Sequence, residues 1–166
     1  VAMEIIEPMP HILLAGGGHC AQAIADASAP LGWSVSVLDA RHEYASEELW
    51  PDAEECIAAE PGVFLSGETT ESLARFSHIL LLGHDWAIDE ALLIGLLERN
   101  EGRPRIGCIG SKAKWRAFEK SALQAGISPK TLDTVICPIG VTIGAESPQE
   151  IAIAVLAQII AEIKGV

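Results

Sequence analysis

At 166 residues, with 49% hydrophobic and 20% charged side chains, the chain is long enough for one globular domain and too apolar for a disordered one. Its 23 acidic residues outnumber its 11 basic ones, and the resulting net charge of -12 disfavours a nucleic-acid partner. The sequence lacks the run of about 18 apolar residues that a membrane-spanning helix needs, and its start lacks the pattern of a signal peptide. We therefore expect one domain over residues 1–166, with residues 1–10 as a lead-in segment, in the cytoplasm and without a membrane partner.

In chain order, short apolar runs alternate with segments of helical spacing. The expected strands are 11–15, 34–39, 62–67, 78–82, 105–110 and a weaker 134–140. The expected helices are 21–31, 70–76, 87–100, 112–126 and one beginning at 148, with a short turn or helix over 128–133. This alternation predicts an α/β protein: a three-layer Rossmann-like fold with a mostly parallel, doubly wound sheet.

The last helix carries its own start signal. Ser147 is the expected N-cap, Pro148 the first helical residue, and Glu150 completes a capping box. Apolar residues nearly encircle the helix that follows, which predicts either a buried position or a subunit contact in a homodimer.

The candidate site residues come directly after strands. Ligands of open α/β sheets bind beyond the carboxyl ends of the strands, so these residues are expected to converge on one cleft. They are Gly16, Gly17, Gly18 and His19 after the first strand; Asp39 and Arg41 after the second; Gly83, His84 and Asp85 after 78–82; Gly110, Ser111 and Lys112 after 105–110; and Gly140 and Gly144 after the last.

The stretch HILLAGGGHCAQAIAD has the features of a phosphate-binding turn. Gly16, Gly18 and Ala21 match Gly-x-Gly-x-x-Gly/Ala between a strand and a helix, which places an anion at the helix N-terminus. Asp39 ends the next strand, where an acid usually accepts hydrogen bonds from a ribose, although Arg41 leaves room for a 2′-phosphate. The pattern favours a nucleotide-bearing ligand; the alternative is a set of glycines that only makes a tight turn.

Other polar residues at helix starts have two interpretations each. Lys112 opposes the helix dipole, which suits a bound anion, or points into solvent. His19 and His84 can donate to a phosphate or cap a backbone carbonyl. Ser111 and Asp85 are expected N-caps, with a ligand role for Asp85 as the alternative.

The cysteines Cys20, Cys56, Cys108 and Cys137 are too widely spaced to suggest a zinc site or a small disulfide framework. We expect reduced thiols, Cys108 and Cys137 in buried strands, and no metal site. Cys20 lies in a first helical turn, where a thiol pKa tends to fall, so it is a reactive thiol or a packed small residue.

Several catalytic patterns are missing from the sequence. There is no GxxxxGK[ST] and no G-x-S-x-G, and Tyr44 has no Lys four residues later. P-loop NTPases, α/β-hydrolases and short-chain dehydrogenases are thereby disfavoured. The chain also lacks the second domain in which most dehydrogenases bind substrate.

Five segments resemble a known family: ILLAGGGHCAQAIA, VSVLDAR, LLGHDWAIDEALL, IGCIGSKAKWRAFEKSALQAGIS and PIGVTIGAESPQEIAIAVLAQIIAEI. In order and spacing they are similar to the C-terminal Rossmann domain of the XdhC/CoxI proteins, accessory factors of xanthine dehydrogenase and carbon monoxide dehydrogenase. The GSK and PIG-x-x-IGA segments are more specific than the glycine pattern.

The resemblance implies an accessory protein rather than an enzyme. Such proteins bind molybdenum cofactor (molybdopterin), support its sulfuration by a cysteine desulfurase, and insert it into an apo xanthine dehydrogenase-type molybdoenzyme. On this interpretation the residues named above, Cys20 and Ala21 included, form the cofactor-binding site. The alternatives are an NAD(P)- or FAD-dependent oxidoreductase that uses the same cleft, and a nucleotide-sensing regulator.

The sequence departs from the family pattern in three places. Cys20 stands where the family has an apolar residue, and Gly83 stands where Thr is common. The family's N-terminal domain, with its own cysteine motif, has no counterpart in this sequence. If the native protein is this short, we expect cofactor insertion to need a separate partner chain, or the activity to have drifted.

Overall fold

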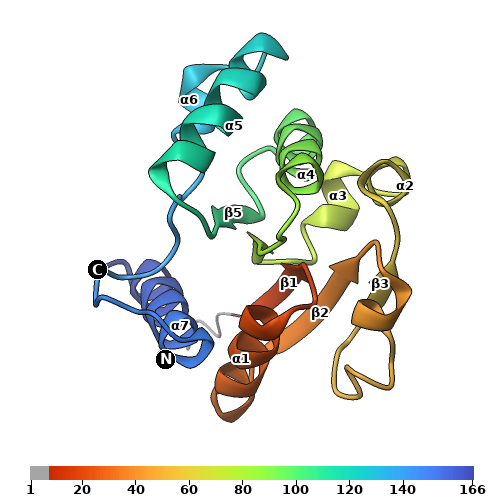
Figure 1. Cartoon of the computed structure of the whole chain (residues 1–166), viewed down its shortest axis with the longest axis vertical. Coiled ribbons are helices and arrows are strands. Elements are labelled where there is room, and N and C mark those ends of the chain that lie inside the picture. Colours follow the sequence, from red (N-terminus) through yellow and green to blue (C-terminus); the bar gives the residue numbers. More distant parts are fainter. Residues whose placement is uncertain (1–7) are drawn as a thin grey trace, which may run out of the picture.

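The computed structural model describes residues 8–166 and contains a five-stranded sheet in which all strands are parallel (Figure 1). The strands are β1 (His11–Ala15), β2 (Ser34–Asp39), β3 (Cys56–Ala58), β4 (His78–Leu81) and β5 (Arg105–Cys108). Their spatial order is β3-β2-β1-β4-β5. The predicted α/β fold with a doubly wound parallel sheet is confirmed. Residues 1–7 of the expected lead-in segment lie outside the described residues.

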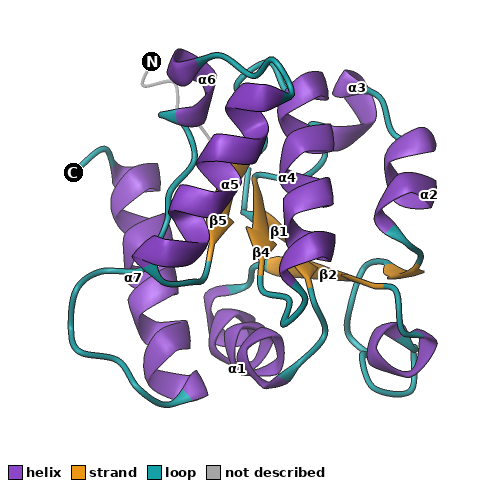
Figure 2. Cartoon of the chain, turned by 45° about the horizontal axis from the view of Figure 1, so that its top comes forward, coloured by secondary structure: helices purple, strands orange, loops and turns teal. Residues whose placement is uncertain are grey.

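Helices cover both faces of the sheet (Figure 2). They are α1 (His19–Ser28), α2 (Pro61–Ser66), α3 (Thr70–Leu73), α4 (Trp86–Arg99), α5 (Lys112–Gln124), α6 (Pro129–Leu132) and α7 (Pro148–Lys164), with 3-10 turns η1 (Ala29–Leu31) and η2 (His42–Ala45). Side chains of α1 and α7 join one core cluster, and those of α2 to α6 join the other. The result is the predicted three-layer arrangement.

Strand β1 shows why the central strands have nearly continuous apolar sequences. Ile12 and Leu14 belong to the cluster on the α1 face, whereas Leu13 and Ala15 belong to the cluster on the α4 face. All four residues are buried. A strand covered on both faces needs apolar residues at every position, and HILLA supplies them.

Helix α7 begins as its sequence predicts. The Ser147 hydroxyl accepts a hydrogen bond from the Glu150 amide, and the Glu150 side chain accepts one from the Ser147 amide. The helix packs against α1 and buries Val155 and Ile159, but Ile153 remains 60% exposed. The helix is therefore buried along one face only.

Two predicted strands differ in the structure. Residues 62–67 are not a strand: Pro61 starts helix α2, which turns Phe64 and Leu65 into the core. The third strand of the sheet is Cys56–Ala58, in a stretch that looks polar in the sequence. The predicted strand 134–140 is reduced to one bridge, between Ile136 and Gly107, because Pro138 has no amide hydrogen to donate to a longer ladder. The predicted helix 70–76 is shorter, ending at Leu73.

The order of the strands creates a crevice at one edge of the sheet. From β1 the chain moves outward to β2 and β3, then returns to the other side of β1 as β4 and β5. The loops that follow β1 and β4 therefore leave in opposite directions. Such a topological switch point is where ligands of open α/β sheets bind.

Candidate functional site

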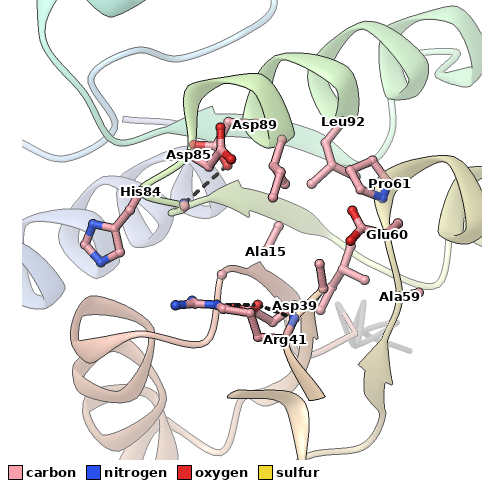
Figure 3. Close-up of a pocket in the computed structure, with 15 residues that line it drawn as sticks. Ala15, Asp39, Arg41, Ala59, Glu60, Pro61, His84, Asp85, Asp89 and Leu92 are labelled. Carbon is pink, nitrogen blue, oxygen red and sulfur yellow. Dashed lines mark hydrogen bonds and ion pairs between the residues drawn. The ribbon is translucent and has the colours of Figure 1, made fainter. Parts of the chain in front are cut away.

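A cleft of about 360 Å³ lies at this switch point, at the carboxyl edge of the sheet (Figure 3). Its walls come from the ends of β1, β2 and β4, from the segment that joins β3 to α2, and from the first turns of α4. The lining residues are Ala15, Gly16, Leu38, Asp39, Ala40, Arg41, Ala59, Glu60, Pro61, Gly83, His84, Asp85, Ile88, Asp89 and Leu92.

The glycine loop after β1 is pressed against its neighbours on two sides. Gly16 has a φ of +114°, and a Cβ there would lie 3.0 Å from the Gly83 nitrogen. A Cβ on Gly17 would lie 2.1 Å from the Tyr44 carbonyl oxygen. Neither position can hold a larger residue without moving the backbone, so the loop needs these glycines for its close approach to β4 and η2.

Asp39 fastens the glycine loop to the end of β2. Its Oδ2 accepts hydrogen bonds from the Gly17 amide and from Arg41 Nη2, each at 2.9 Å. Its Oδ1 accepts from the Arg41 amide at 2.9 Å and from Arg41 Nε at 3.0 Å. Burial alone would raise the pKa of Asp39, but the hydrogen bonds from Arg41 and Gly17 outweigh it and lower the pKa below its ordinary value. A ribose hydroxyl on this carboxylate would therefore compete with Arg41.

Arg41 is held in place while much of it stays accessible. Its guanidinium lies 3.6 Å from the centre of the Tyr44 ring, a cation–π contact, and pairs with both oxygens of Asp39. Its side chain is nevertheless 47% exposed. It therefore presents a fixed positive charge at the edge of the cleft.

The N-terminus of α1 is open to a ligand. Its N-cap is Gly18, which provides no side-chain cap, and the first turn contains no acidic residue. The first amides of a helix have no partner within the helix and attract anions. His84 is exposed, and a Cβ on Gly18 would lie 3.7 Å from its Nε2 atom. Amide groups and an imidazole therefore meet at this point.

A buried ion pair supports the α4 wall of the cleft. Lys114 Nζ lies 2.8 Å from Asp89 Oδ2 and donates a further hydrogen bond to the Ile109 carbonyl at 3.1 Å. The two side chains are 6% and 1% exposed. Burial raises the pKa of Asp89 although Lys114 opposes the shift. Asp89 Oδ1 also accepts a hydrogen bond from the Gly83 amide at 3.3 Å, which fixes the start of the β4–α4 loop.

The structure brings part of the predicted site together. Gly16, Asp39, Arg41, His84 and Asp85 line the cleft, and Gly17 and Gly18 lie in the adjoining loop. Asp85 is the predicted N-cap: its Oδ1 accepts a hydrogen bond from the Ala87 amide at 2.9 Å. Gly83, where the family commonly has Thr, has no room for a Cβ, which would lie 2.5 Å from Asp89 Oδ1.

The expectation that all candidate site residues line one cleft is wrong. Gly110, Ser111, Lys112, Gly140 and Gly144 are not among the lining residues. Ser111 caps α5 as predicted, and Lys112 is exposed. Gly140 packs against α7, where a Cβ would lie 3.3 Å from Ala154 Cβ, and Gly144 is exposed with nothing nearby. These five residues therefore lie outside the cleft, on the segments that lead into α5 and α7.

The three candidate site residues in the first turn of α1 differ in exposure. His19 is exposed, Cys20 is half-buried, and Ala21 is completely buried against the sheet. The expected fall of the Cys20 pKa is wrong, because burial raises it. Its thiol is correspondingly less reactive than its place in the helix suggested.

The sequence-predicted site lacks the apolar wall residues and three charged residues that line or support the cleft: Glu60, Asp89 and Lys114. Asp89 and Lys114 are buried charges on otherwise apolar helix faces, next to Leu92 and Phe118 respectively. That position was the available signal, since a charge on the core face of a helix needs a partner. Glu60 lies at the rim, and within residues 8–166 its side chain forms no hydrogen bond or ion pair.

Over 8–166, the His, Cys, Asp and Glu side chains form no group of three or more that could hold a metal ion. In the same part of the chain, every helix is too short or too polar to cross a bilayer.

A parallel sheet with a glycine turn and an open helix N-terminus at its switch point defines a Rossmann-type binding domain. Residues 12–159 match the family described as the XdhC Rossmann domain, and the chain belongs to this family.

Relatives of known sequence or structure are consistent with that assignment. The chain is 33% identical to YqeB of Escherichia coli K12 over 152 residues, which is 91% of this chain and 27% of that protein. It is also 33% identical over 160 residues to a Bacillus subtilis 168 protein described as a probable xanthine dehydrogenase subunit, covering 95% of this chain and 44% of that one. A crystal structure described as a xanthine dehydrogenase from Bacillus halodurans superposes with a TM-score of 0.77 at 28% identity, over 96% of this chain and 44% of that chain. The chain thus spans less than half the length of these relatives.

Proposed function

We propose that this domain is an accessory protein for a xanthine dehydrogenase-type molybdoenzyme. In this role it binds molybdenum cofactor as cargo in the switch-point cleft, supports sulfuration of the cofactor by a cysteine desulfurase, and helps to insert it into the apoenzyme. The observation that carries the proposal is the cleft itself, with the uncapped α1 N-terminus at the end of the adjoining glycine loop, in a chain of the XdhC Rossmann family. The names of the Bacillus relatives supply the class of enzyme served.

The residues present suit the two chemical parts of such a cargo. A phosphate fits the uncapped first turn of α1, where Arg41 and His84 add donors. A flat heterocycle fits the apolar walls made by Leu38, Ile88 and Leu92. The rim carboxylate of Glu60 can accept hydrogen bonds from the amino group of a pterin. These residues bind and orient; no step of covalent chemistry is assigned to them.

An oxidoreductase that uses NAD(P) or FAD in the same cleft is the second candidate. The observation that favours it is Asp39 at the end of β2, the position of the ribose-binding acid in dinucleotide-binding domains. The same residue also weakens it, because both carboxylate oxygens already bind Arg41.

Anaerobic calorimetry separates the two candidates. The chain is titrated with molybdenum cofactor released from a molybdoenzyme, and separately with NAD, NADP and FAD. The proposal predicts saturable binding of the molybdenum cofactor and weak or no binding of the dinucleotides. Tight NAD binding with no response to the molybdenum cofactor would overturn it in favour of the oxidoreductase.

Two glycine variants locate the binding. Gly18→Asp places a negative charge at the α1 N-terminus and should abolish binding of the cofactor. Gly67→Asp is the matched control, because Gly67 is exposed at the C-cap of α2 with an ordinary φ of -88°. Equal loss in both variants would mean that the site lies elsewhere. Transfer is then measured as activation of an apo xanthine dehydrogenase-type enzyme by the loaded wild-type chain, relative to free cofactor.

A further inference from the structure

Two of the four cysteines, Cys108 and Cys137, face each other at the β5 edge of the sheet. Gly107 pairs with Ile136 in a parallel bridge made by two hydrogen bonds. The Ile136 amide donates to the Ile106 carbonyl at 3.0 Å, and the Cys108 amide donates to the Ile136 carbonyl at 2.9 Å. Cys108 and Cys137 are the next residues on the two segments. In a parallel pair, residues at the same offset lie opposite one another and point to the same face.

The packing of the side chains agrees with this register. Cys108 belongs to the core cluster on the α4 face, and Cys137 packs against the same cluster. The residue before Cys137, Ile136, and the residue after Cys108, Ile109, pack against the cluster on the opposite face. The Ile139 amide donates to the Cys108 carbonyl at 2.9 Å and holds the segment beyond Cys137 against β5. Adjacent strands lie about 4.8 Å apart, within the range of Cα separations that a disulfide spans.

The two thiols differ in accessibility and acidity. Cys108 is completely buried, whereas Cys137 keeps part of its surface exposed. The neighbouring Cys108 thiol lowers the pKa of Cys137, and Lys114 adds to the effect. The same contact, together with burial, raises the pKa of Cys108. A partly exposed thiol whose pKa is lowered, next to a buried thiol whose pKa is raised, is a suitable arrangement for disulfide exchange.

We propose that Cys108 and Cys137 form a dithiol–disulfide redox site that exchanges with low-molecular-weight disulfides such as oxidised glutathione. The thiolate of Cys137 attacks one sulfur of the external disulfide and releases one thiol, leaving a mixed disulfide on Cys137. Cys108 then gives up its proton and attacks Cys137 Sγ, which releases the second thiol. Two thiols of the chain are oxidised, one external disulfide is reduced, and the protons leave on the released thiols.

The site has a direct structural consequence. A Cys108–Cys137 bond ties the segment after α6 covalently to β5, near the Lys114–Asp89 pair that supports the cleft. The bond closes the loop that contains α5 and α6, and loop closure restricts the unfolded chain. The oxidised form should therefore unfold several degrees above the reduced form.

The experiment is an exchange reaction on the native chain. Reduced protein is incubated with oxidised glutathione, acid-quenched, alkylated and analysed by mass spectrometry and peptide mapping. The four free thiols should fall to two, with a mass loss of two hydrogens and a peptide that links Cys108 to Cys137. The double variant Cys20→Ser/Cys56→Ser should form the same bond. Cys108→Ala should stop at the glutathione adduct of Cys137, and Cys137→Ser should form neither product.

A second readout does not depend on forming the bond. Iodoacetamide should alkylate Cys137 several-fold faster than Cys20 or Cys56 at neutral pH, because burial raises the pKa of the other two. The advantage should shrink in Cys108→Ala, which removes the neighbouring thiol. The proposal is overturned if the wild-type chain stops at a glutathione adduct, if it links through Cys20 or Cys56, or if the Cys108–Cys137 bond forms only in denaturant.

Discussion

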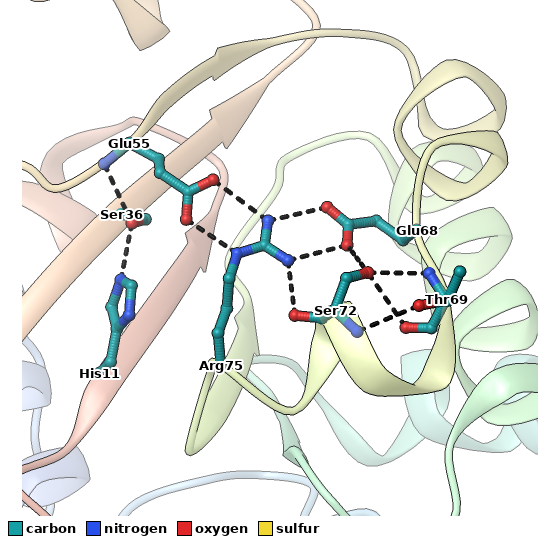
Figure 4. A network of polar contacts seen from close by, with 7 residues as sticks. All are labelled: His11, Ser36, Glu55, Glu68, Thr69, Ser72 and Arg75. Atoms are coloured by element: carbon teal, nitrogen blue, oxygen red, sulfur yellow. Dashed lines mark hydrogen bonds and ion pairs between the residues drawn. The ribbon is translucent and has the colours of Figure 1, made fainter.

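At the amino edge of the sheet, where the strands begin, the Arg75 guanidinium forms ion pairs with both Glu55 and Glu68. At the carboxyl edge, where the strands end, Arg41 forms an ion pair with Asp39 alone and stays 47% exposed beside the cleft. The Arg75 network continues through Ser72 and Thr69 (Figure 4). Beside it, the Ser36 hydroxyl lies 2.7 Å from His11 Nε2 and accepts a hydrogen bond from the Glu55 amide.

The carboxyl edge also has fixed charges, but some of its polar groups have no partner among the described residues and face solvent. The α1 N-terminus has no side-chain cap, and His84 and the unpaired Glu60 are exposed where they line the cleft. Polar groups that satisfy one another contribute to stability, while polar groups without partners at a concave surface are available to a ligand. The two edges therefore differ in exposure rather than in charge: in the described residues the atoms without partners at the amino edge, Asn100 Oδ1 and Glu162 Oε1, are buried, whereas those of the carboxyl edge face a concave surface.

The largest expected effect comes from the one fully buried ion pair at the carboxyl edge of the described chain. Lys114→Met leaves Asp89 without its cation and should lower the free energy of unfolding by about 3–5 kcal/mol. Urea denaturation at neutral pH measures the loss. The double variant Asp89→Asn/Lys114→Met should recover most of it, because no unpaired charge remains buried. If the double variant is no more stable than Lys114→Met, the pair is not the cause.

The glycine loop provides the next effect. Gly17→Ala drives a Cβ against the Tyr44 carbonyl and should cost about 1–3 kcal/mol. Gly62→Ala is the control with the opposite sign: Gly62 lies in helix α2 with nothing within 4 Å, so alanine should stabilise the chain by up to about 1 kcal/mol. Similar losses in both variants, by the same denaturation measurement, would contradict the account of the loop.

The fold was largely predictable because its signals are local. The run HILLA, the three glycines after it and the Ser147–Glu150 capping box each lie within a few neighbouring residues. The segment GVFLSG was misassigned because six apolar-rich residues are compatible with a strand or a helix, and only the tertiary position of Phe64 decides between them.

The site was less predictable because it depends on contacts between distant elements. The sequence pointed to Lys112 as the cation after β5, whereas the structure buries Lys114. Which of the two faces the core depends on the packing of α5 against α4, and that is not encoded in the spacing of the lysines. The Cys108–Cys137 pair likewise arises from the single bridge at Ile136.

Arg75 tests the amino edge. Its side chain is 32% exposed, so solvent weakens its ion pairs, and Arg75→Met should cost about 1 kcal/mol despite the paired contacts with Glu55 and Glu68. Arg116→Met on exposed α5 surface is the control and should change stability by less than about 0.5 kcal/mol. A loss as large as that of Lys114→Met would make the Arg75 network as important to stability as the buried ion pair.

The smallest effect is a dependence on pH that separates the two edges. Burial lowers the pKa of His78 at the amino edge, and Glu162 opposes this only in part. The unfolded chain therefore takes up a proton at this residue first, so stability falls as pH drops below the ordinary value of 6.5 toward the folded pKa. Asp39 at the carboxyl edge has a lowered pKa. Its contribution is complete above the ordinary value of 3.8 and is lost as pH falls through the folded pKa.

Urea denaturation between about pH 7.5 and about pH 2 measures both windows. His78→Gln should flatten the curve just below pH 6.5 and leave the acidic part unchanged, apart from a residual slope from His11, whose pKa burial also lowers. Asp39→Asn should reduce the slope of the acidic part and leave the upper part unchanged, with a residual acidic slope from Glu68, whose pKa the hydrogen bond from Arg75 also lowers. If Asp39→Asn flattens the upper window instead, the titration just below pH 6.5 does not belong to His78, and the assignment of that window to the amino edge fails.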